Sequence, residues 1–231
     1  MDCFNASESP MMKYIQWRTL FIVCGYLSLS HLLSSCQDEL MEKVVVFSDD
    51  FSSMDATHLT NGKWHEFNGD TVLGWYHNEE VTLNIPKLPS HNTLEITIEL
   101  LIHDSWDGNP DNIGGPDYWL MHLDGEEIIN ATFSNTPCGF NFCLYQSFPE
   151  NYPRTFEPKT GAIDTALPGR CQYNGVQGWT SKYRITRLIK HDSPSLSISL
   201  KDQLLQLNAA DPKCDESWSV SKIEISTLTV K

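Results

Sequence analysis

Alternation of apolar and polar residues is the strongest pattern along this chain. In residues 94–102 the positions Leu94, Ile96, Ile98, Leu100 and Ile102 alternate with Glu95, Thr97, Glu99 and Leu101. Successive side chains of a strand point to opposite faces, so this period of two predicts a strand with one buried face. Residues 80–85 show a shorter version, and weaker patterns predict strands at 44–47, 118–123, 126–133, 183–189, 195–200, 204–207 and 218–230.

Turn residues divide these segments. Asp124-Gly125, a preferred tight-turn pair, lies between two of them and predicts a hairpin. No segment keeps a helical period. Short strands at regular spacing, separated by Gly, Pro, Asn and Asp, predict an all-β protein with two antiparallel sheets packed as a sandwich. Residues 134–180 have little strand pattern, and such a long irregular stretch is usually functional or cross-linked.

The N-terminal residues indicate export. Lys13 and Arg18 precede an apolar stretch at 20–33, which is too short and too polar for a bilayer span of about 20 residues. The small residues before Cys36 resemble a bacterial lipobox, and Gln37-Asp38-Glu39 resembles the acidic signal of surface-exported Bacteroidota lipoproteins.

These resemblances imply a division of the chain into a lipoprotein signal peptide (1–35), a tether lipidated at Cys36 (36–43) and one domain (44–231). They place the protein at the outer membrane or cell surface, with the lipid as its one membrane contact. The alternative is a plain signal peptide or a membrane-anchored helix in which Cys36 has no role.

Charge and cysteine content fit an exported protein. The chain has 16 Lys and Arg against 30 Asp and Glu, a net charge of −14, which argues against nucleic acid and anionic lipid as partners. Four cysteines follow the tether: Cys138, Cys143, Cys171 and Cys214. In an oxidising compartment they predict two disulfides with three possible pairings, and we favour Cys138–Cys143 and Cys171–Cys214. Four free thiols are the alternative.

A family resemblance refines the expected fold. The opening Phe47-Ser48-Asp49-Asp50-Phe51, followed by Trp64, resembles the start of concanavalin A-like domains. The closing residues 215–225, acidic, then aromatic, then alternating, are similar to the last strand of such domains. The resemblance implies a jelly-roll β-sandwich whose last strand pairs with the first, carrying a long disulfide-pinned loop excursion.

Oxygen-bearing side chains are densest at residues 104–117. We predict a calcium site there, because a glycine-bearing loop with alternate acidic and amide side chains can supply several oxygens. The predicted ligands are Asp104, Asp107, Asn109 and Asp111. The jelly-roll resemblance implies a second set near the first and last strands, namely Asp49, Asp50 and Glu216. The alternative is a solvated Asp/Asn turn.

Two carboxylates on one strand suggest a catalytic alternative. Glu95-Ile96-Thr97-Ile98-Glu99 resembles the Glu-x-Asp-x-Glu strand of laminarinase-like glycoside hydrolases, with Thr97 in place of the central aspartate. The backbones of Glu95 and Glu99 would lie roughly 13 Å apart, whereas a retaining pair needs its carboxyl groups about 5–5.5 Å apart. A polar strand face is the simpler interpretation.

Aromatic residues complete the candidate chemistry. Trp106, Trp179 and Tyr118 are the expected ligand-binding side chains, since aromatic faces stack on sugar rings and anchor interfaces. Packing within the fold is the alternative. Without a recognisable catalytic set, the sequence favours a lipid-anchored surface protein that binds a glycan or an extracellular protein. A hydrolase or lyase using Glu95 and Glu99, and a structural envelope or adhesion component, are the alternatives.

Overall fold

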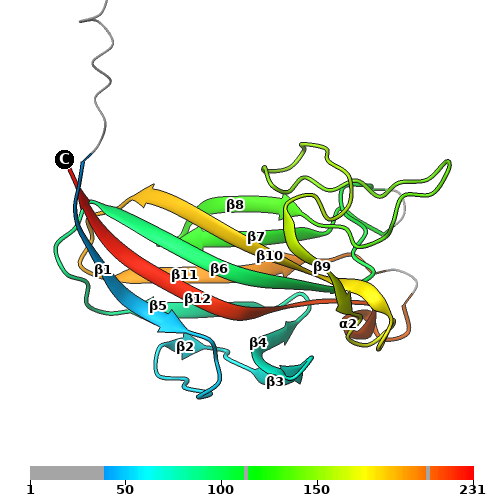
Figure 1. Cartoon of the computed structure of the whole chain (residues 1–231), viewed down its shortest axis with the longest axis horizontal. Coiled ribbons are helices and arrows are strands. Elements are labelled where there is room, and N and C mark those ends of the chain that lie inside the picture. The colour runs from blue at the N-terminus through cyan, green and yellow to red at the C-terminus, as the bar shows by residue number, and fades with distance from the viewer. Residues whose placement is uncertain (1–38, 112–113, 207–208) are drawn as a thin grey trace, which may run out of the picture. The chain divides into compact units, whose positions relative to one another are not determined.

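The computed structural model describes residues 39–111, 114–206 and 209–231 (Figure 1). Cys36 and the expected signal peptide lie outside these residues. Residues 40–231 form one compact unit. Its strands are β1 (Leu40–Asp49), β2 (Leu59–Thr60), β3 (Trp64–Phe67), β4 (Asp70–Tyr76), β5 (Glu80–Ile85), β6 (Thr93–Asp104), β7 (Tyr118–Leu123), β8 (Glu126–Thr132), β9 (Ala162–Pro168), β10 (Gln177–Lys190), β11 (Leu196–Gln203) and β12 (Glu216–Val230). The short helix α2 (Pro212–Asp215) directly precedes β12. Within the described ranges, no helix has the length and apolar character to cross a membrane.

Two antiparallel sheets pack as a jelly-roll β-sandwich, as the sequence predicts. The larger sheet has seven strands in the order β3-β4-β12-β6-β10-β9, and β1 also pairs with β12. The smaller sheet has five strands in the order β2-β5-β11-β7-β8. The long strands β6, β10 and β12 run across the molecule in Figure 1, and the longest loops gather at one of its ends.

The alternation in β6 behaves as predicted, with one exception. Leu94, Ile96, Ile98, Leu100 and Ile102 are all at most 1% exposed and face the core between the sheets. Leu101 belongs to the opposite face but is also buried, because Phe67 and Val72 of the β3–β4 hairpin cover it. A second, smaller apolar cluster therefore lies on the outer side of the larger sheet.

Two pairings predicted from the sequence are confirmed. β7 and β8 form a hairpin, and Asp124 and Gly125 between them have φ of 49° and 89°. Two positive φ values are what a tight turn matched to strand twist requires. β1 pairs antiparallel with β12, so the first and last strands are neighbours. β1 begins at Leu40, which places part of the expected tether in the strand.

Other segments correct the prediction. Residues 204–206 form no strand, because the N–H of Leu204 donates to the side chain of Asn78 and not to a neighbouring strand. β4 was missed because Val72, Leu73 and Gly74 are consecutively buried, which removes the alternation. β9 lies inside the stretch expected to be irregular, and its largely exposed residues carry no strand pattern.

The loop excursion is fixed by disulfides and by one buried amide. Both favoured disulfides form: Cys138–Cys143 closes a short loop, and Cys171–Cys214 joins the excursion to α2. The side chain of Gln146 is fully buried. It accepts from the N–H groups of Ser134 and Lys159 and donates to two carbonyls of the excursion. A buried polar group with all its partners gives such a loop a defined position.

The chain turn after β6 requires a glycine. Gly108 has φ of +75°, and a Cβ placed on it would lie 2.2 Å from the carbonyl oxygen of Tyr145. The same carbonyl accepts from Asn109 N–H at 2.7 Å, so the two backbones must stay close.

We expect Gly108→Ala to lower the free energy of unfolding by about 2–4 kcal/mol, because the methyl group both meets backbone and stays at positive φ. Gly125→Ala is the matched control: its φ is +89°, but nothing lies within 4 Å of its Cβ position. It should cost only about 1 kcal/mol. Urea denaturation of both variants measures the difference, and equal losses would contradict the close approach at Gly108.

Candidate functional site

Three carboxylates converge where β6, β7 and β12 meet. Asp107 lies in the loop after β6, Asp117 directly precedes β7, and Glu216 is the first residue of β12. Each offers an oxygen, and these oxygens lie within 4.8 Å of one another. Asp117 and Glu216 are 0% exposed. The strand pairing brings them together, since Glu216 pairs with Asp104 at the point where the chain leaves β6.

The protein itself does little to neutralise this cluster. One oxygen of Asp117 accepts from the N–H of Asp107, but the other oxygen has no hydrogen-bond partner among the described residues. Neither carboxylate oxygen of Glu216 has a hydrogen-bond partner among the residues that the structure describes. No ion pair formed by the described residues includes any of the three carboxylates.

This environment disfavours the charged forms. Burial raises the pKa of Asp107 to about 6, and the nearby charge of Asp215 adds to the rise. Burial raises the pKa of Asp117 and Glu216 well above their ordinary values. The charge of Asp107 adds to the rise at Asp117, and the charge of Asp117 adds to the rise at Glu216. Uncompensated buried charges of this kind need a proton or a cation.

Only part of the predicted calcium set takes part in this cluster. Asp107 and Glu216 do, each from a different predicted set. Asn109 is engaged elsewhere: its Oδ1 accepts from Thr132 and its Nδ2 donates to the carbonyl of Arg154. Asp111 is exposed. Asp117, which was not among the predicted ligands, ends the same acidic segment.

The acidic residues of the first strand and its turn bind their own backbone. Asp49 accepts from the N–H of Phe51 at 2.7 Å, and Asp50 accepts from the N–H and hydroxyl of Ser52. These contacts are local turns and bring neither side chain to the cluster.

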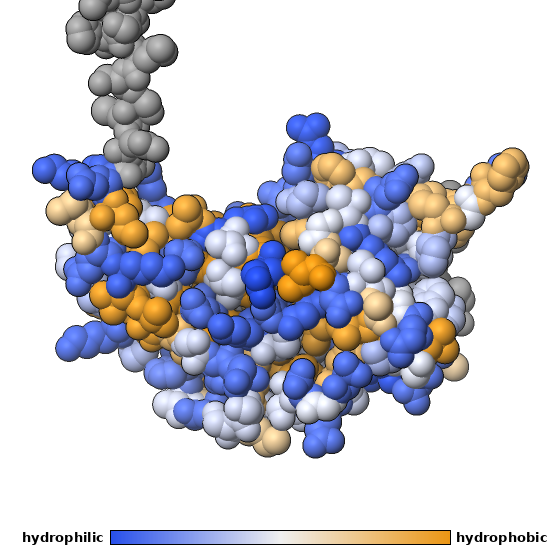
Figure 2. Space-filling view, in the orientation of Figure 1, coloured by the Kyte–Doolittle hydropathy of each residue, from blue (hydrophilic) through white to orange (hydrophobic). Residues whose placement is uncertain are grey.

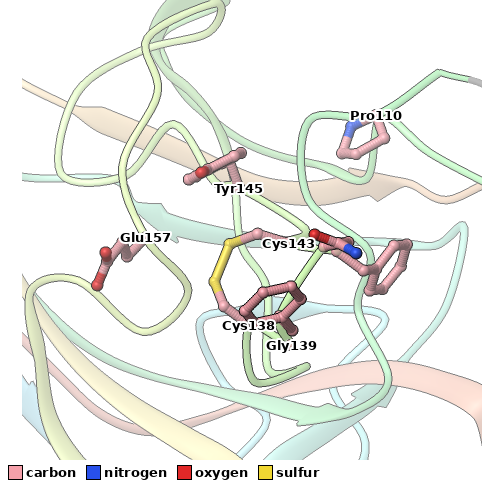
Figure 3. Close-up of a pocket in the computed structure, with 9 residues that line it drawn as sticks. Pro110, Cys138, Gly139, Cys143, Tyr145 and Glu157 are labelled. Atoms are coloured by element: carbon pink, nitrogen blue, oxygen red, sulfur yellow. A yellow bond between two sulfur atoms is a disulfide. The ribbon is translucent and has the colours of Figure 1, made fainter.

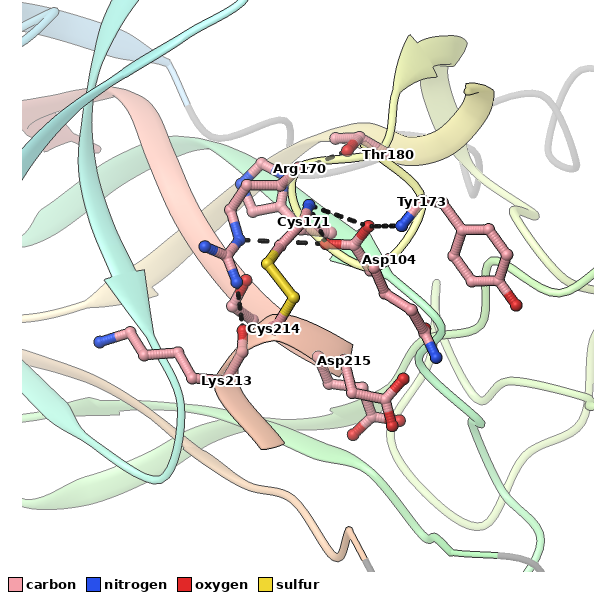
Figure 4. Close-up of polar contacts among 12 residues, drawn as sticks. Asp104, Arg170, Cys171, Tyr173, Thr180, Lys213, Cys214 and Asp215 are labelled. Atoms are coloured by element: carbon pink, nitrogen blue, oxygen red, sulfur yellow. Dashed lines mark hydrogen bonds and ion pairs between the residues drawn. A yellow bond between two sulfur atoms is a disulfide. The ribbon is translucent and has the colours of Figure 1, made fainter. Parts of the chain in front are cut away.

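Asp104, the remaining predicted ligand, serves a different purpose (Figure 4). Its carboxylate is 0% exposed and accepts from the N–H groups of Cys171 and Tyr173, at 3.0 and 3.1 Å. Arg170 lies 3.9 Å away and its guanidinium packs over the ring of Trp75. Asp104 therefore holds the loop that the Cys171–Cys214 disulfide ties to α2.

That loop forms one wall of a pocket of about 320 Å³ beside the carboxylate cluster. The aromatic lining residues are Phe142 and Tyr173, and Asp107, Asp215, Gln172, Gln206 and Ser105 supply polar groups. Tyr173 stacks flat on Trp179, with ring centroids 3.6 Å apart. The pocket thus combines aromatic surface with hydrogen-bonding groups.

A second, more open pocket adjoins the Cys138–Cys143 loop (Figure 3). It has a volume of about 550 Å³ and includes Pro110, Tyr145 and Glu157. Phe140, at the tip of the disulfide-closed loop, is 100% exposed. The sequence analysis did not identify these residues, because in an irregular loop no periodic pattern distinguishes an exposed aromatic side chain from a buried one.

The aromatic residues chosen from the sequence have different surroundings. Trp106 is 0% exposed and its indole N–H donates to the carbonyl of Ser217. Its ring therefore belongs to the core and offers no surface to a ligand, which corrects the choice of Trp106 as a ligand-binding side chain. Trp179 is half-buried beneath Tyr173. Tyr118 is half-buried and meets Tyr152 edge to face, 5.2 Å away.

The carboxylates of the hydrolase alternative are both paired. Lys43 lies 2.8 Å from Glu95, and Glu99 contacts Lys182 and Arg184. These cations outweigh the effect of burial and lower the pKa of Glu99. Neither carboxylate lines the two pockets described above.

Comparison with known proteins assigns the chain to no family. No family model matches it, and no curated protein matches it. Among solved structures it is similar to dimeric latent PorU from Porphyromonas gingivalis, at 11% identity and a TM-score of 0.40, over 84% of this chain and 14% of that chain. This chain therefore spans only a small part of the length of the PorU chain.

Smaller neighbours match over nearly their whole length. A family 35 carbohydrate binding module from Clostridium thermocellum has 9% identity and a TM-score of 0.35, over 80% of this chain and 97% of that one. The C-terminal CBM6 of LamC from Zobellia galactanivorans has 10% identity and a TM-score of 0.33, over 80% and 98%. TM-scores this low assign neither a family nor a ligand. The class that the structure itself defines is the jelly-roll β-sandwich.

Removal of the Asp104 carboxylate tests its role as a loop anchor. We expect Asp104→Ala to lower the free energy of unfolding by about 3–5 kcal/mol, because Arg170 and two N–H groups lose their buried partner. Asp50→Ala, at an exposed turn, should change it little. Guanidinium denaturation compares the two variants, and an equally small loss in both would show that Asp104 holds nothing in place.

Proposed function

We propose that this protein binds a glycan in the pocket lined by Tyr173 and Phe142. The observation that carries the proposal is the union of aromatic rings with amide, hydroxyl and carboxylate groups in one cavity of about 320 Å³. Small-molecule sites commonly have volumes of roughly 300–1,000 Å³. A sugar offers an apolar ring face for stacking and hydroxyls for hydrogen bonds, which matches this lining.

Tyr173 is well prepared to act as a stacking platform. Its ring lies against Trp179, and its N–H is fixed by the buried carboxylate of Asp104. The disulfide at Cys171 restrains the chain two residues earlier. A side chain held this way loses little freedom when a ligand binds, and this favours affinity.

The polar lining suits hydroxyl recognition. The hydroxyl of Ser105 lies within hydrogen-bond distance of the side-chain oxygens of Gln172 and Asp215 and can donate its one proton to either, which holds these groups beside one another in the pocket. Gln172 is exposed, and its amide can donate as well as accept. This mixture supports a neutral polyhydroxylated ligand over a purely apolar one.

An extracellular protein is the second candidate partner. The fully exposed Phe140 and the half-exposed Phe142, at 49%, favour it, since exposed aromatics anchor protein interfaces. The face seen in Figure 2 is largely hydrophilic, with hydrophobic residues in separate groups. An apolar contact would therefore be confined to small areas of that face.

Catalysis by Glu95 and Glu99 forms no part of this proposal. Both carboxylates are held by basic side chains, and neither lines either of the two pockets described above. A general acid would need a raised pKa, whereas the pKa of Glu99 is lowered.

We expect glycan binding to depend on Tyr173 specifically. Screening the purified protein on a glycan array should identify a ligand, and Tyr173→Ala should weaken its binding at least 10-fold by losing the stacking surface. Tyr152→Ala is the matched control, since Tyr152 is 37% exposed but lines neither pocket.

The control also tests the site near Tyr118. Binding that survives Tyr173→Ala and disappears in Tyr152→Ala would move the site to the Tyr118–Tyr152 pair, which lies outside the proposed pocket. Absence of any array ligand, together with capture of a protein partner that depends on Phe140, would favour the protein-binding alternative.

We further propose that a lipid on Cys36 anchors the protein to the membrane, with the pocket outside the cell. Cys36→Ser should then shift the protein from the membrane fraction to the soluble fraction, because serine lacks the sulfur atom to which the lipid is attached. Fractionation followed by immunoblotting measures this. Unchanged membrane retention of the variant would indicate a different anchor.

A further inference from the structure

The Asp107–Asp117–Glu216 cluster has an unbalanced charge in a buried place. Asp117 and Glu216 have no exposed surface, and three of their four carboxylate oxygens lack a hydrogen-bond partner among the described residues. Proteins pair their buried carboxylates with donors or cations in nearly every case. Asp104, only a few residues away along the chain, has such partners, and this cluster has none of equal strength.

Nearby basic side chains are committed to other groups. Arg170 lies by Asp104 and donates to the carbonyl of Lys213. Lys213 itself pairs with Glu79. Asp215, which is 8% exposed, adds a further negative charge near Asp107. A compensating positive charge therefore has to come from outside the described part of the chain.

The backbone leaves room at this point. Gly114 has φ of +129°, and a Cβ built on it would lie 3.0 Å from Oδ2 of Asp107 and 3.4 Å from the carbonyl oxygen of Leu205. A side chain would fill the space between these two oxygens. With glycine there, the Leu205 carbonyl is a candidate fourth oxygen ligand beside the three carboxylates.

The size and chemistry of the cluster select the ion. All the groups are oxygens, which suits a hard cation. Calcium binds oxygens at about 2.3–2.6 Å, so two of its ligands can be up to about 5 Å apart, whereas magnesium at about 2.0–2.1 Å requires a tighter set. Oxygens within 4.8 Å of one another fit the calcium sphere.

We propose that Asp107, Asp117 and Glu216 bind a calcium ion that joins the loop after β6 to the first residue of β12. The ion connects three segments that are far apart in sequence and neutralises the charge that the protein leaves uncompensated. This site differs from the ligand set expected from sequence, since it excludes Asp104, Asn109 and Asp111. It does not depend on the proposed glycan pocket.

Thermal melting of the purified protein tests the proposal. Calcium at about 100 times its Kd should raise Tm by roughly 5–10 °C over the value in EDTA, since a ligand that binds only the native state stabilises it. Magnesium at the same concentration should raise Tm much less. Isothermal titration calorimetry should show one calcium per chain.

Glu216→Gln gives the sharpest variant. It keeps the shape of the side chain and removes one charge, so in EDTA it should melt at or above the wild-type Tm, while the calcium shift disappears. Asp111→Asn is the matched control from the same loop and should retain the full shift. Should Glu216→Gln fail to fold, the partly exposed Asp107→Asn takes its place.

Two results would overturn the proposal. The first is a wild-type Tm that is equal in calcium and EDTA, with Glu216→Gln stabilised in both, because the cluster would then be neutralised by shared protons. The second is a calcium shift that Asp111→Asn removes and Glu216→Gln retains, because the ion would then lie on the acidic loop alone.

Discussion

The antiparallel pairing of β6 with β12 is the constraint on which the functional end of the molecule depends. Its register runs from Thr93 opposite Leu228 to Asp104 opposite Glu216. Because both strands reach the same edge, the loop that leaves β6 and the helix that enters β12 meet there. The disulfide from Cys214 then brings the long excursion to the same place. A register slip of one residue would turn Glu216 to the other face and separate the carboxylates.

Acidic side chains are buried at this edge in two different ways, although the residues lie close together. Asp104 is buried with backbone N–H donors and Arg170, which oppose the rise that burial causes in its pKa. Asp117 and Glu216 are buried with mostly unpartnered oxygens, so their balance must come from a proton or a cation. The first arrangement fixes a loop and belongs to the architecture. The second leaves a binding capacity, which is why we assign the ion to it.

The sequence predicted what depends on local pattern. Alternation located β5 and β6, and Asp124-Gly125 located the hairpin, because side-chain period and turn residues are local properties. It missed β4, which is buried on both faces, and β9, an exposed edge strand. Within the site, composition pointed to the acidic segment 104–117, but of the ligands predicted there only Asp107 joins the cluster, and Asp117 of the same segment was missed. Which carboxylates meet depends on strand register and on φ at Asp104, where +63° turns the chain out of β6.

Asp107 connects the two proposals physically, since it lines the aromatic pocket and also contributes an oxygen to the carboxylate cluster. A cation held at the cluster would withdraw the charge of Asp107 from the pocket and fix the loop after β6, which carries Asp107. Any effect of the ion on ligand affinity must be matched by an equal effect of the ligand on ion affinity, because coupling free energy is reciprocal. Tyr173 lies on a different loop, which Asp104 and a disulfide anchor, and its ring stacks on Trp179 of β10. The aromatic wall therefore keeps its place whether or not the ion is bound. Coupling between the two sites therefore has to act through Asp107 and the polar side of the pocket.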